Sequence, residues 1–340
     1  GRHAGRSKNF FALGILAWMY TRDTEAVNAW IDEKFSGDDA VRQANRRALS
    51  AGHAFGETAA LGANAVIVPA SKRAPGTYRS VDGNTALAWG LIAAGVCAEL
   101  PVFLGSYPIT PASAILHELA RHPDAGVRTF QAEDEIAAIT SAIGAAFGGD
   151  LAVTTTSGPG LALKAEALGL AVSLELPLIV VDIQRGGPAT GLPTKTEASD
   201  LMIALYGRHG ESPLPVISAS RPGECFEVAI EAARLALKYR TPVILLSDGY
   251  LANSSEPWRL PDVSELPDIS VAKTTEPNHE RPDGGSDFWP YERDPDTLAR
   301  PWAVPGTPGL EHRIGGLEKA DGTGNISYDP DNHQRMTDLR

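Results

Sequence analysis

The chain has 340 residues and carries 30 lysines and arginines against 42 aspartates and glutamates, so its formal net charge is −12 and its pI is near 5.2. This acidity argues against a nucleic-acid-binding surface, and the lack of a signal-like segment or of an unbroken apolar stretch of about 20 residues argues for a cytoplasmic protein that spans no membrane. The two cysteines, Cys97 and Cys225, form no CxxC motif, which excludes a disulfide scaffold, a cysteine-type zinc site and an iron–sulfur cluster held by this chain.

Residues 1–60 favour helices. An amphipathic helix is predicted from Thr24 to Phe35, and a second from about Asp38 to Ala51, where an acidic pair suits the helix N-terminus. Residues 61–82 contain two prolines and a Ser-Lys-Arg cluster, and we interpret them as a linker. The chain opens with Gly-Arg-His instead of methionine, as a processed product or an excised segment would.

Residues 83–255 alternate short apolar runs with segments of helical pattern. The expected strands are 101–106, 127–130, 151–156, 176–183, 214–219 and 242–246, and the expected helices between them are 111–121, 134–147, 161–174, 197–205 and 222–239. This alternation indicates an α/β fold, a doubly wound and mostly parallel sheet with helices on both faces. Ligands of such sheets bind at the carboxyl ends of the strands, so the loops after the strands are the candidate functional segments.

The last segment, 256–340, has a different composition. Within 261–340 there are 16 acidic and 8 basic residues, so this stretch carries −8 of the net charge, and it holds 10 of the 25 prolines. Only 21 of these 80 residues are apolar. Such a composition favours an extended, Pro- and Asp-rich linker over a packed domain.

Two of the loops after strands carry polar residues beside a helix start. The first, Tyr107-Pro-Ile-Thr-Pro111, fits a proline-containing turn in which Thr110 caps the next helix, or an anion site made by a hydroxyl and free N–H groups. The second, 131–135, contains Glu133 and Glu135 and opens a helix rich in alanine and glycine. Acidic residues there suit the helix dipole, and the small residues let the helix approach another backbone or a partner closely.

Two further loops are rich in glycine. Residues 154–160 read Thr-Thr-Thr-Ser-Gly-Pro-Gly and lack the lysine of a P-loop, so alone they indicate only a tight turn. Residues 184–196 place Arg185 directly after a buried strand, where a guanidinium is a good anion ligand. His117 and His122 are five residues apart, one too many for the zinc-protease helix, and no GxSxG motif is present. No metal site is expected in this chain.

In order and spacing, these four loops resemble those of the 2-oxoacid:ferredoxin oxidoreductases. The chain is similar to the α subunit of these enzymes, whose pyrimidine-binding domain helps to bind thiamine diphosphate. The long loop 184–196 and the segment 205–210 are most similar to the 2-oxoglutarate type. The resemblance implies that 1–60 is the C-terminal tail of a γ-type oxidoreductase domain, 61–82 a linker, 83–255 the pyrimidine-binding domain, and 256–340 a linker toward a C-terminal domain that this chain does not include.

The resemblance also implies roles for single residues. Glu135 matches the catalytic glutamate that bonds N1′ of the thiamine aminopyrimidine and so promotes loss of the C2 proton, with Glu133 as the nearby alternative. Thr110, Arg185 and Thr194 match residues that hold the substrate carboxylate. The positions expected to bind the cofactor are Tyr107, Pro108, Glu135, Ser157 and Gly158.

The implied reaction is the oxidative decarboxylation of 2-oxoglutarate to succinyl-CoA, with coenzyme A as co-substrate and with electrons passed to ferredoxin. Thiamine diphosphate is expected to be shared with a β subunit, and Mg²⁺ and a [4Fe–4S] cluster to lie on that subunit, because this chain lacks a Gly-Asp-Gly motif followed by an Asn pair. Ferredoxin would bind through the β subunit, in an αβ or (αβ)2 assembly, and the chain would be inactive alone. Two alternatives stay open: a pyruvate or indolepyruvate oxidoreductase subunit, and a non-catalytic α/β assembly subunit.

Overall fold

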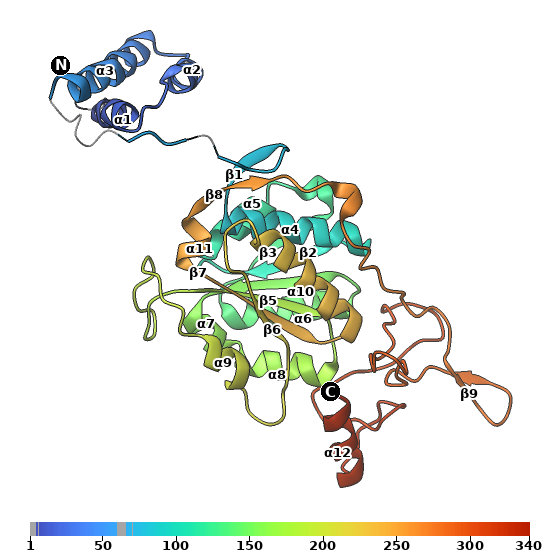
Figure 1. The fold of residues 1–340 in the computed structure, drawn as a ribbon. Coiled ribbons are helices and arrows are strands. Elements are labelled where there is room, and N and C mark those ends of the chain that lie inside the picture. Colours follow the sequence, from blue (N-terminus) through green and yellow to red (C-terminus); the bar gives the residue numbers. More distant parts are fainter. Residues whose placement is uncertain (1–4, 6, 60–65, 70) are drawn as a thin grey trace. The chain divides into compact units, whose positions relative to one another are not determined.

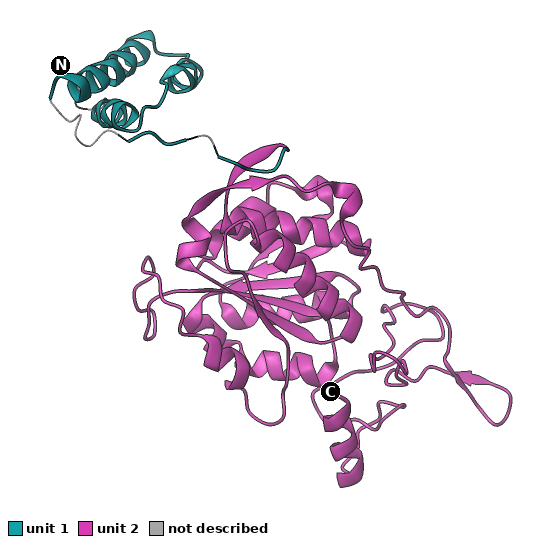
Figure 2. Cartoon of the chain, in the orientation of Figure 1, with its two compact units in different colours: residues 1–75 teal, residues 76–340 magenta. Residues whose placement is uncertain are grey.

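The computed structural model describes residues 5, 7–59, 66–69 and 71–340, and the chain divides into two compact units, 1–75 and 76–340 (Figure 2). Residues 1–3, which open the sequence, and residues 60–65 and 70, in and beside the predicted linker, lie outside the described residues. The last part of that linker forms a strand, β1, Tyr78–Asp82, and belongs to the second unit.

The first unit consists of helices α1, Lys8–Met19, α2, Glu25–Lys34, and α3, Asp39–Thr58. Asp38 caps α3, its carboxylate accepting a hydrogen bond from the Val41 amide at 3.0 Å, and the helix extends past the expected end to Thr58. Glycines let α1 and α3 pack closely. A Cβ on Gly14 or Gly52 would overlap the backbone of the other helix. Trp30 and Phe55 remain about half exposed, at 49% and 48%.

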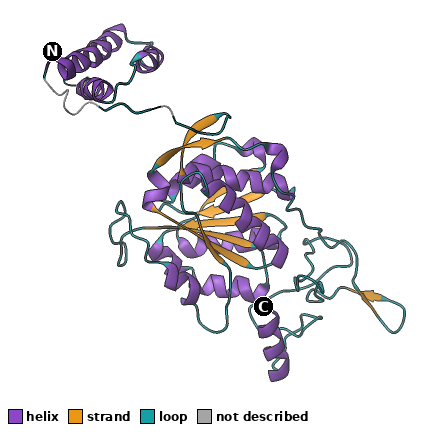
Figure 3. Cartoon of the chain, viewed as in Figure 1, coloured by secondary structure: helices purple, strands orange, loops and turns teal. Residues whose placement is uncertain are grey.

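The second unit is built on a six-stranded, fully parallel sheet with helices on both faces (Figures 1 and 3). The strands are β2, Val102–Ser106, β3, Val127–Gln131, β4, Leu151–Thr156, β5, Leu178–Gln184, β6, Val216–Ser218, and β7, Pro242–Asp248. Their order in the sheet is β3-β2-β4-β5-β7-β6. This architecture confirms the doubly wound α/β fold, and a separate antiparallel pair joins β1 to β8, Ser255–Arg259.

Two apolar cores lie on opposite faces of the sheet. The helices of one face are α4, Gly83–Ala98, α5, Ser113–Leu119, and α10, Cys225–Tyr239; those of the other are α6, Glu135–Phe147, α7, Gly158–Leu163, α8, Ala165–Leu174, and α9, Leu201–Tyr206. Helix α4 has no amphipathic pattern in the sequence, because it is apolar on nearly every side and buried against α10. Short helices α11, Gly249–Asn253, η2, Pro123–Ala125, and η3, Val263–Glu265, complete the connections.

The chain enters three strands of the sheet, at their amino ends, through the same kind of turn. Helices α4, α8 and α10 each end at a residue in the left-handed conformation, Glu99, Glu175 and Arg240, with φ of 55°, 55° and 51°. A proline follows two residues later in each case, so the helix cannot continue and the chain turns into a strand. Among the described residues, no helix has both the length and the apolar content needed to cross a lipid bilayer.

The segment 256–340 has little regular structure beyond β8, but it is packed against the sheet domain. It contains β9, His279–Glu280, β10, Ser286–Asp287, and α12, Pro330–Leu339. Trp302 is 1% exposed and donates its indole N–H to the carbonyl oxygen of Ala146 at 3.1 Å, and Arg300 donates to the carbonyl oxygens of Leu174 and Glu175, both at 2.9 Å. The segment therefore differs from a free linker, because a few large side chains anchor it.

Candidate functional site

The candidate site lies at the carboxyl ends of β2 and β4, where the direction of the chain through the sheet reverses. These two strands are neighbours, but the chain leaves β2 toward α5 on one face and leaves β4 toward α7 on the other. The two loops therefore diverge, which is where doubly wound sheets bind ligands. The loop after β2 contains Tyr107, the loop after β4 contains Ser157, and the first turn of α6 lies beside both.

Hydroxyl groups gather at this edge. Tyr107 is 5% exposed, and its phenol oxygen is 2.8 Å from Oγ1 of Thr156, while the Ser106 and Thr155 hydroxyls are 2.6 Å apart. Burial raises the pKa of the Tyr107 phenol far above its usual value, and the neighbouring Glu135 carboxylate raises it further, against the opposing effects of Thr156 and Arg185. Tyr107 therefore stays a neutral hydrogen-bond donor at any physiological pH.

Glu135 joins this cluster through the start of α6. Asp134 caps the helix by accepting from the Ala137 amide at 2.8 Å, which makes Glu135 the first helical residue. A Cβ on Gly160 would overlap the Tyr107 and Thr156 oxygens and would lie 3.0 Å from Cγ of Glu135, so only glycine leaves room for these three side chains to meet; we call this packed group the cradle at Gly160. Glu133, the alternative glutamate, is exposed and makes no hydrogen bond or ion pair within the described parts of the chain.

A buried lysine that the sequence interpretation missed lies beneath Glu135. The Lys164 side chain is 0% exposed, and its ammonium donates to the carbonyl oxygen of Glu135 at 2.9 Å and to Oγ1 of Thr154 at 3.0 Å. The ammonium is also 5.1 Å from the centroid of the Tyr107 ring. Burial lowers the pKa of Lys164 to about 7. A single lysine in the apolar segment 161–174 was the signal that could have revealed it.

Arg185 and Thr110 are brought together, as their shared predicted role requires. Arg185 is 6% exposed and donates from its two terminal nitrogens to the carbonyl oxygens of Thr110, at 2.6 Å, and Thr190, at 3.0 Å. The contact uses the Thr110 main chain, and the residue as a whole is exposed. Thr110 does not cap α5, because the helix starts three residues later, after a turn in which Ser113 Oγ bonds the backbone of Ile109.

The loop 185–196 folds back on itself. Gly186 receives a hydrogen bond from the Leu192 amide at 2.8 Å and donates its own amide to the Lys195 carbonyl at 2.9 Å. Thr194 is exposed in the turn of this loop, and within the described residues it makes no hydrogen bond to Thr110 or Arg185. Pro108 is likewise exposed, next to the buried Tyr107.

Two carboxyl groups, one buried and one half-buried, support the loop after β4. Asp182, 0% exposed on β5, faces Asp200, which precedes α9, and a Cβ on Gly158 would lie 2.9 Å from the Asp200 carboxylate. Burial raises the pKa of both aspartates. The Asp200 carboxyl raises the pKa of Asp182 further, whereas the hydrogen bond with Asp182 partly opposes the rise at Asp200. The Ser157 hydroxyl is buried without a hydrogen-bond partner among the described residues. No group of three or more His, Cys, Asp or Glu residues suited to a metal ion occurs in the described ranges.

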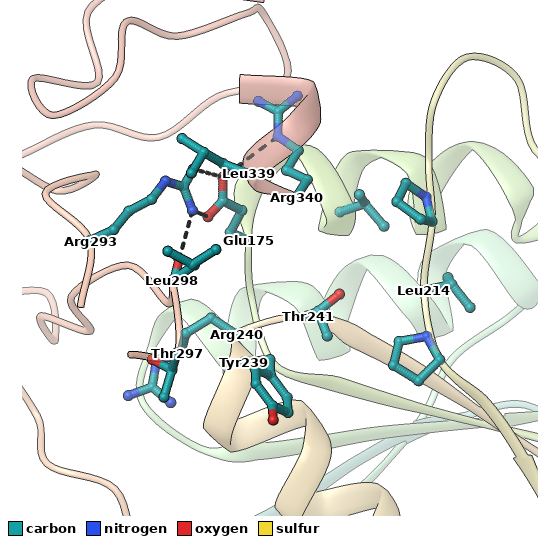
Figure 4. Close-up of a pocket in the computed structure, with 13 residues that line it drawn as sticks. Glu175, Leu214, Tyr239, Arg240, Thr241, Arg293, Thr297, Leu298, Leu339 and Arg340 are labelled. Carbon is teal, nitrogen blue, oxygen red and sulfur yellow. Dashed lines mark hydrogen bonds and ion pairs between the residues drawn. The ribbon is translucent and has the colours of Figure 1, made fainter. Parts of the chain in front are cut away.

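A separate cavity of about 340 Å³ lies at the opposite edge, near the amino ends of β5, β6 and β7 (Figure 4). Glu175 accepts two hydrogen bonds from Arg293, both at 2.6 Å, and lies 3.5 Å from Nε of Arg340. The carboxylate thus pairs with two of the three arginines that line the cavity, Arg293 and Arg340, and not with Arg240. We interpret this cluster as the attachment of the tail, distinct from the hydroxyl-rich edge.

Comparison with known proteins identifies the family of the chain. Residues 94–328 match the family model described as "Pyruvate flavodoxin/ferredoxin oxidoreductase, thiamine diP-bdg". The chain is 58% identical over 337 residues to the 2-oxoglutarate oxidoreductase subunit KorA of Mycobacterium tuberculosis, covering 98% of this chain and 50% of that protein. It is 35% identical to subunit alpha of the 2-oxoacid:ferredoxin oxidoreductase 1 of Aeropyrum pernix, covering 99% of this chain and 51% of that protein.

Among solved structures, the chain matches the 2-oxoglutarate:ferredoxin oxidoreductase from Magnetococcus marinus, which has 2-oxoglutarate, coenzyme A and succinyl-CoA bound. The TM-score is 0.87 at 38% sequence identity, with 98% of this chain and 56% of that chain covered. The chain therefore spans about half the length of the relatives that it matches.

Proposed function

Because this chain belongs to the pyruvate flavodoxin/ferredoxin oxidoreductase family of thiamine diphosphate-binding domains, we propose that it is part of the α subunit of a 2-oxoglutarate:ferredoxin oxidoreductase. The complete enzyme would convert 2-oxoglutarate and coenzyme A into succinyl-CoA and CO2, and would pass the electrons to ferredoxin. The names of the relatives, and the ligands of the Magnetococcus marinus enzyme, support this choice of substrate.

The observation that carries the proposal is the convergence of Glu135, Tyr107 and Thr156 at Gly160. A carboxylate and two hydroxyls packed together at one edge of the sheet suit the polar edge atoms of an aminopyrimidine ring. When bound, thiamine diphosphate supplies the carbon nucleophile and electron sink for decarboxylation. Glu135 would hold a proton at N1′ of its aminopyrimidine ring. The other cofactor-binding positions would be Tyr107, Pro108, Ser157 and Gly158.

The substrate carboxylates would be held by Arg185 and the loops that it joins. The Arg185 guanidinium links the Thr110 main chain to Thr190, in the loop that also carries the exposed Thr194. A fixed guanidinium beside hydroxyl groups suits a dicarboxylate substrate, because charge-assisted hydrogen bonds orient it. We assign Thr110, Arg185 and Thr194 to this role.

A β subunit would complete the site. Apolar side chains are exposed on the helices that begin at or near the carboxyl edge: Ile136 (52%), Leu163 (56%), Met202 (65%) and Tyr206 (73%). Exposed apolar side chains concentrated on one region are typical of an interface. We assign Mg²⁺ and the [4Fe–4S] cluster to the β subunit, and ferredoxin binding to the same subunit, in an αβ or (αβ)2 assembly. Without that subunit the chain would be inactive.

The remaining parts of the chain fit the same assignment. We propose that 1–60 is the end of a γ-type domain, because α1–α3 leave large apolar side chains such as Leu16, Trp30 and Phe55 exposed, as a piece of a larger core would. Residues 61–82 would link it to the pyrimidine-binding domain, 83–255, and residues 256–340 would lead toward a further domain. The protein would act in the cytoplasm.

Co-expression with a candidate β subunit tests the proposal. The purified complex is assayed for coenzyme A-dependent reduction of ferredoxin or viologen with 2-oxoglutarate, pyruvate and indolepyruvate as alternative substrates. We expect the highest kcat/KM for 2-oxoglutarate. A higher value for pyruvate or indolepyruvate would reassign the substrate, and a complex that assembles but turns over none of the three would indicate an assembly subunit.

A further inference from the structure

Lys164 is a buried cation beside the candidate site, and no carboxylate neutralises it directly. It takes part in no ion pair within 4.0 Å among the described residues, although its side chain is 0% exposed. Its neighbours are a carbonyl oxygen, a hydroxyl and the Tyr107 ring face, at 2.9, 3.0 and 5.1 Å. Burying an ammonium on such partial compensation is costly, so the position calls for an explanation.

The contacts of this ammonium all belong to the candidate site. One joins α6 at Glu135, one joins β4 at Thr154, and the third is the ring of Tyr107, whose hydroxyl bonds Thr156. The charged and titratable groups that face Lys164 are the carboxylates of Glu135 and Asp134, on α6, and the Tyr107 phenol. The lysine thus ties together three separate elements around the cradle at Gly160.

We propose that Lys164 is a positioning residue of the thiamine site, which fixes the first turn of α6 and places a buried positive charge behind the Glu135 carboxylate. The inference rests on the proposed function, since Glu135 gains its role from the cofactor. The hydrogen bond from the Lys164 ammonium to the Glu135 carbonyl oxygen holds the first turn of α6 beside β4 and Tyr107. Lys164 touches neither substrate nor reacting atoms in this role.

The test compares Lys164→Met with Lys319→Met. Lys319 is a matched control because it is also buried, at 2% exposed, and burial lowers its pKa to about 8, but its contacts are Ser173, Gly315 and Leu317. Both variants are made in the complex with the β subunit. The measurements are the thiamine diphosphate Kd, kcat and KM for 2-oxoglutarate, the pH profile of kcat, and Tm at several pH values.

Loss of Lys164 should lower kcat about tenfold or more and weaken thiamine diphosphate binding about tenfold, with KM for 2-oxoglutarate within about twofold. The kcat profile of Lys164→Met should lose the change that the wild type shows around the Lys164 pKa of about 7, because the variant has no ammonium to deprotonate there. Lys319→Met should move none of these. Thr154→Val keeps the Lys164 ammonium but removes one of its hydrogen-bond acceptors, so it should also lower kcat, by a smaller factor. This variant replaces Lys164→Met in the test if Lys164→Met does not fold.

Stability provides a readout that needs no activity. Because the folded pKa of Lys164, about 7, lies below the 10.5 of an ordinary lysine, the wild-type stability should rise with pH across that window. The Tm of Lys164→Met relative to wild type should therefore be higher at pH 6 than at pH 10, and Lys319→Met should behave similarly over a narrower window. A Tm difference independent of pH would contradict the buried ammonium.

The two proposals fail in different ways. If Lys164→Met keeps the wild-type cofactor Kd, kcat and pH profile, as Lys319→Met should, the lysine is merely structural and the inference is overturned. If the wild-type complex turns over no 2-oxoacid, the proposed function fails. The role of Lys164 is then tested by the thiamine diphosphate Kd alone. An unchanged Kd in Lys164→Met overturns that role, and a Kd weakened in Lys164→Met but not in Lys319→Met supports it.

Discussion

At the scale of single residues, position after a strand predicts which polar residues lie close together, but not which of their atoms make the contacts. Arg185 follows a buried strand and Thr110 follows another, so parallel strands bring them to one edge. The contact between them is made by the main-chain oxygen of Thr110, which no residue-type argument could specify. Lys164 was missed because a lysine in a helical segment is normally solvated, and only the fold shows that its ammonium turns inward.

Replacing Arg185 should impair substrate binding. Arg185→Ala removes a buried guanidinium and its bonds to Thr110 and Thr190, and we expect KM for 2-oxoglutarate to rise about tenfold to a hundredfold, equivalent to roughly 1.5–3 kcal/mol. Steady-state kinetics of the assembled complex measure this. Lys195→Ala, in the same loop but with an exposed side chain, is the control and should leave KM unchanged. An unchanged KM in Arg185→Ala would remove the residue from the substrate site.

At the scale of elements, the strands of the sheet were the most predictable part. The inner strands β4, β5 and β7 are short apolar runs that are almost fully buried, and all six expected strands are present within a few residues of their predicted bounds. Helix α4 escaped prediction because its surface is apolar almost all round, and the expected helix 161–174 is divided at Lys164 into α7 and α8. The Asp182–Asp200 contact was also beyond prediction, since it joins β5 to a residue 18 positions later.

The Asp182–Asp200 pair should make stability depend on pH. Burial raises the pKa of Asp182 above that of an unfolded aspartate, so the folded state binds more protons, and its stability is fully present at low pH and is lost as pH rises through the folded pKa. Asp182→Asn removes this loss. Its Tm should match wild type near pH 4 and exceed it by roughly 3 °C at pH 8. Thermal unfolding over this pH range is the measurement.

Asp124→Asn is the matched control for that experiment, because Asp124 is an exposed aspartate in η2. Its Tm should follow that of wild type at every pH. An Asp182→Asn variant with a Tm below wild type at pH 8 would mean that the carboxyl pair stabilises the β5–α9 connection while ionised, contrary to the raised pKa.

At the scale of the whole molecule, composition described the tail correctly as poor in apolar residues but could not show that it is anchored. Four large side chains, Tyr291, Arg300, Trp302 and Lys319, are each at most 2% exposed, and all four donate hydrogen bonds to α6 or α8. A few aromatic and cationic anchors change the overall composition very little, so composition alone does not reveal them. The same holds for the cluster around Glu175, whose partners are 118 and 165 residues away in the sequence.

Removing the Glu175 carboxylate should loosen the tail. Glu175→Gln leaves the Arg293 and Arg340 guanidinium groups buried without their shared counter-ion, and we expect a loss of about 3–5 kcal/mol in the free energy of unfolding. Denaturant unfolding measures the loss. The control is Glu231→Gln, which breaks the partly exposed pair with Arg234 and should cost at most about 1 kcal/mol. Equal effects of the two substitutions would show that Glu175 is not the anchor.

The central claim is that Glu135 is the carboxylate of a thiamine diphosphate site, and the most direct test is 2-oxoglutarate turnover by Glu135→Gln in the complex with its β subunit. We expect kcat to fall by about a hundredfold to ten-thousandfold while the subunits still assemble. Glu133→Gln, two residues earlier and exposed, should keep nearly wild-type kcat. A Glu135→Gln complex with nearly wild-type kcat would contradict the account.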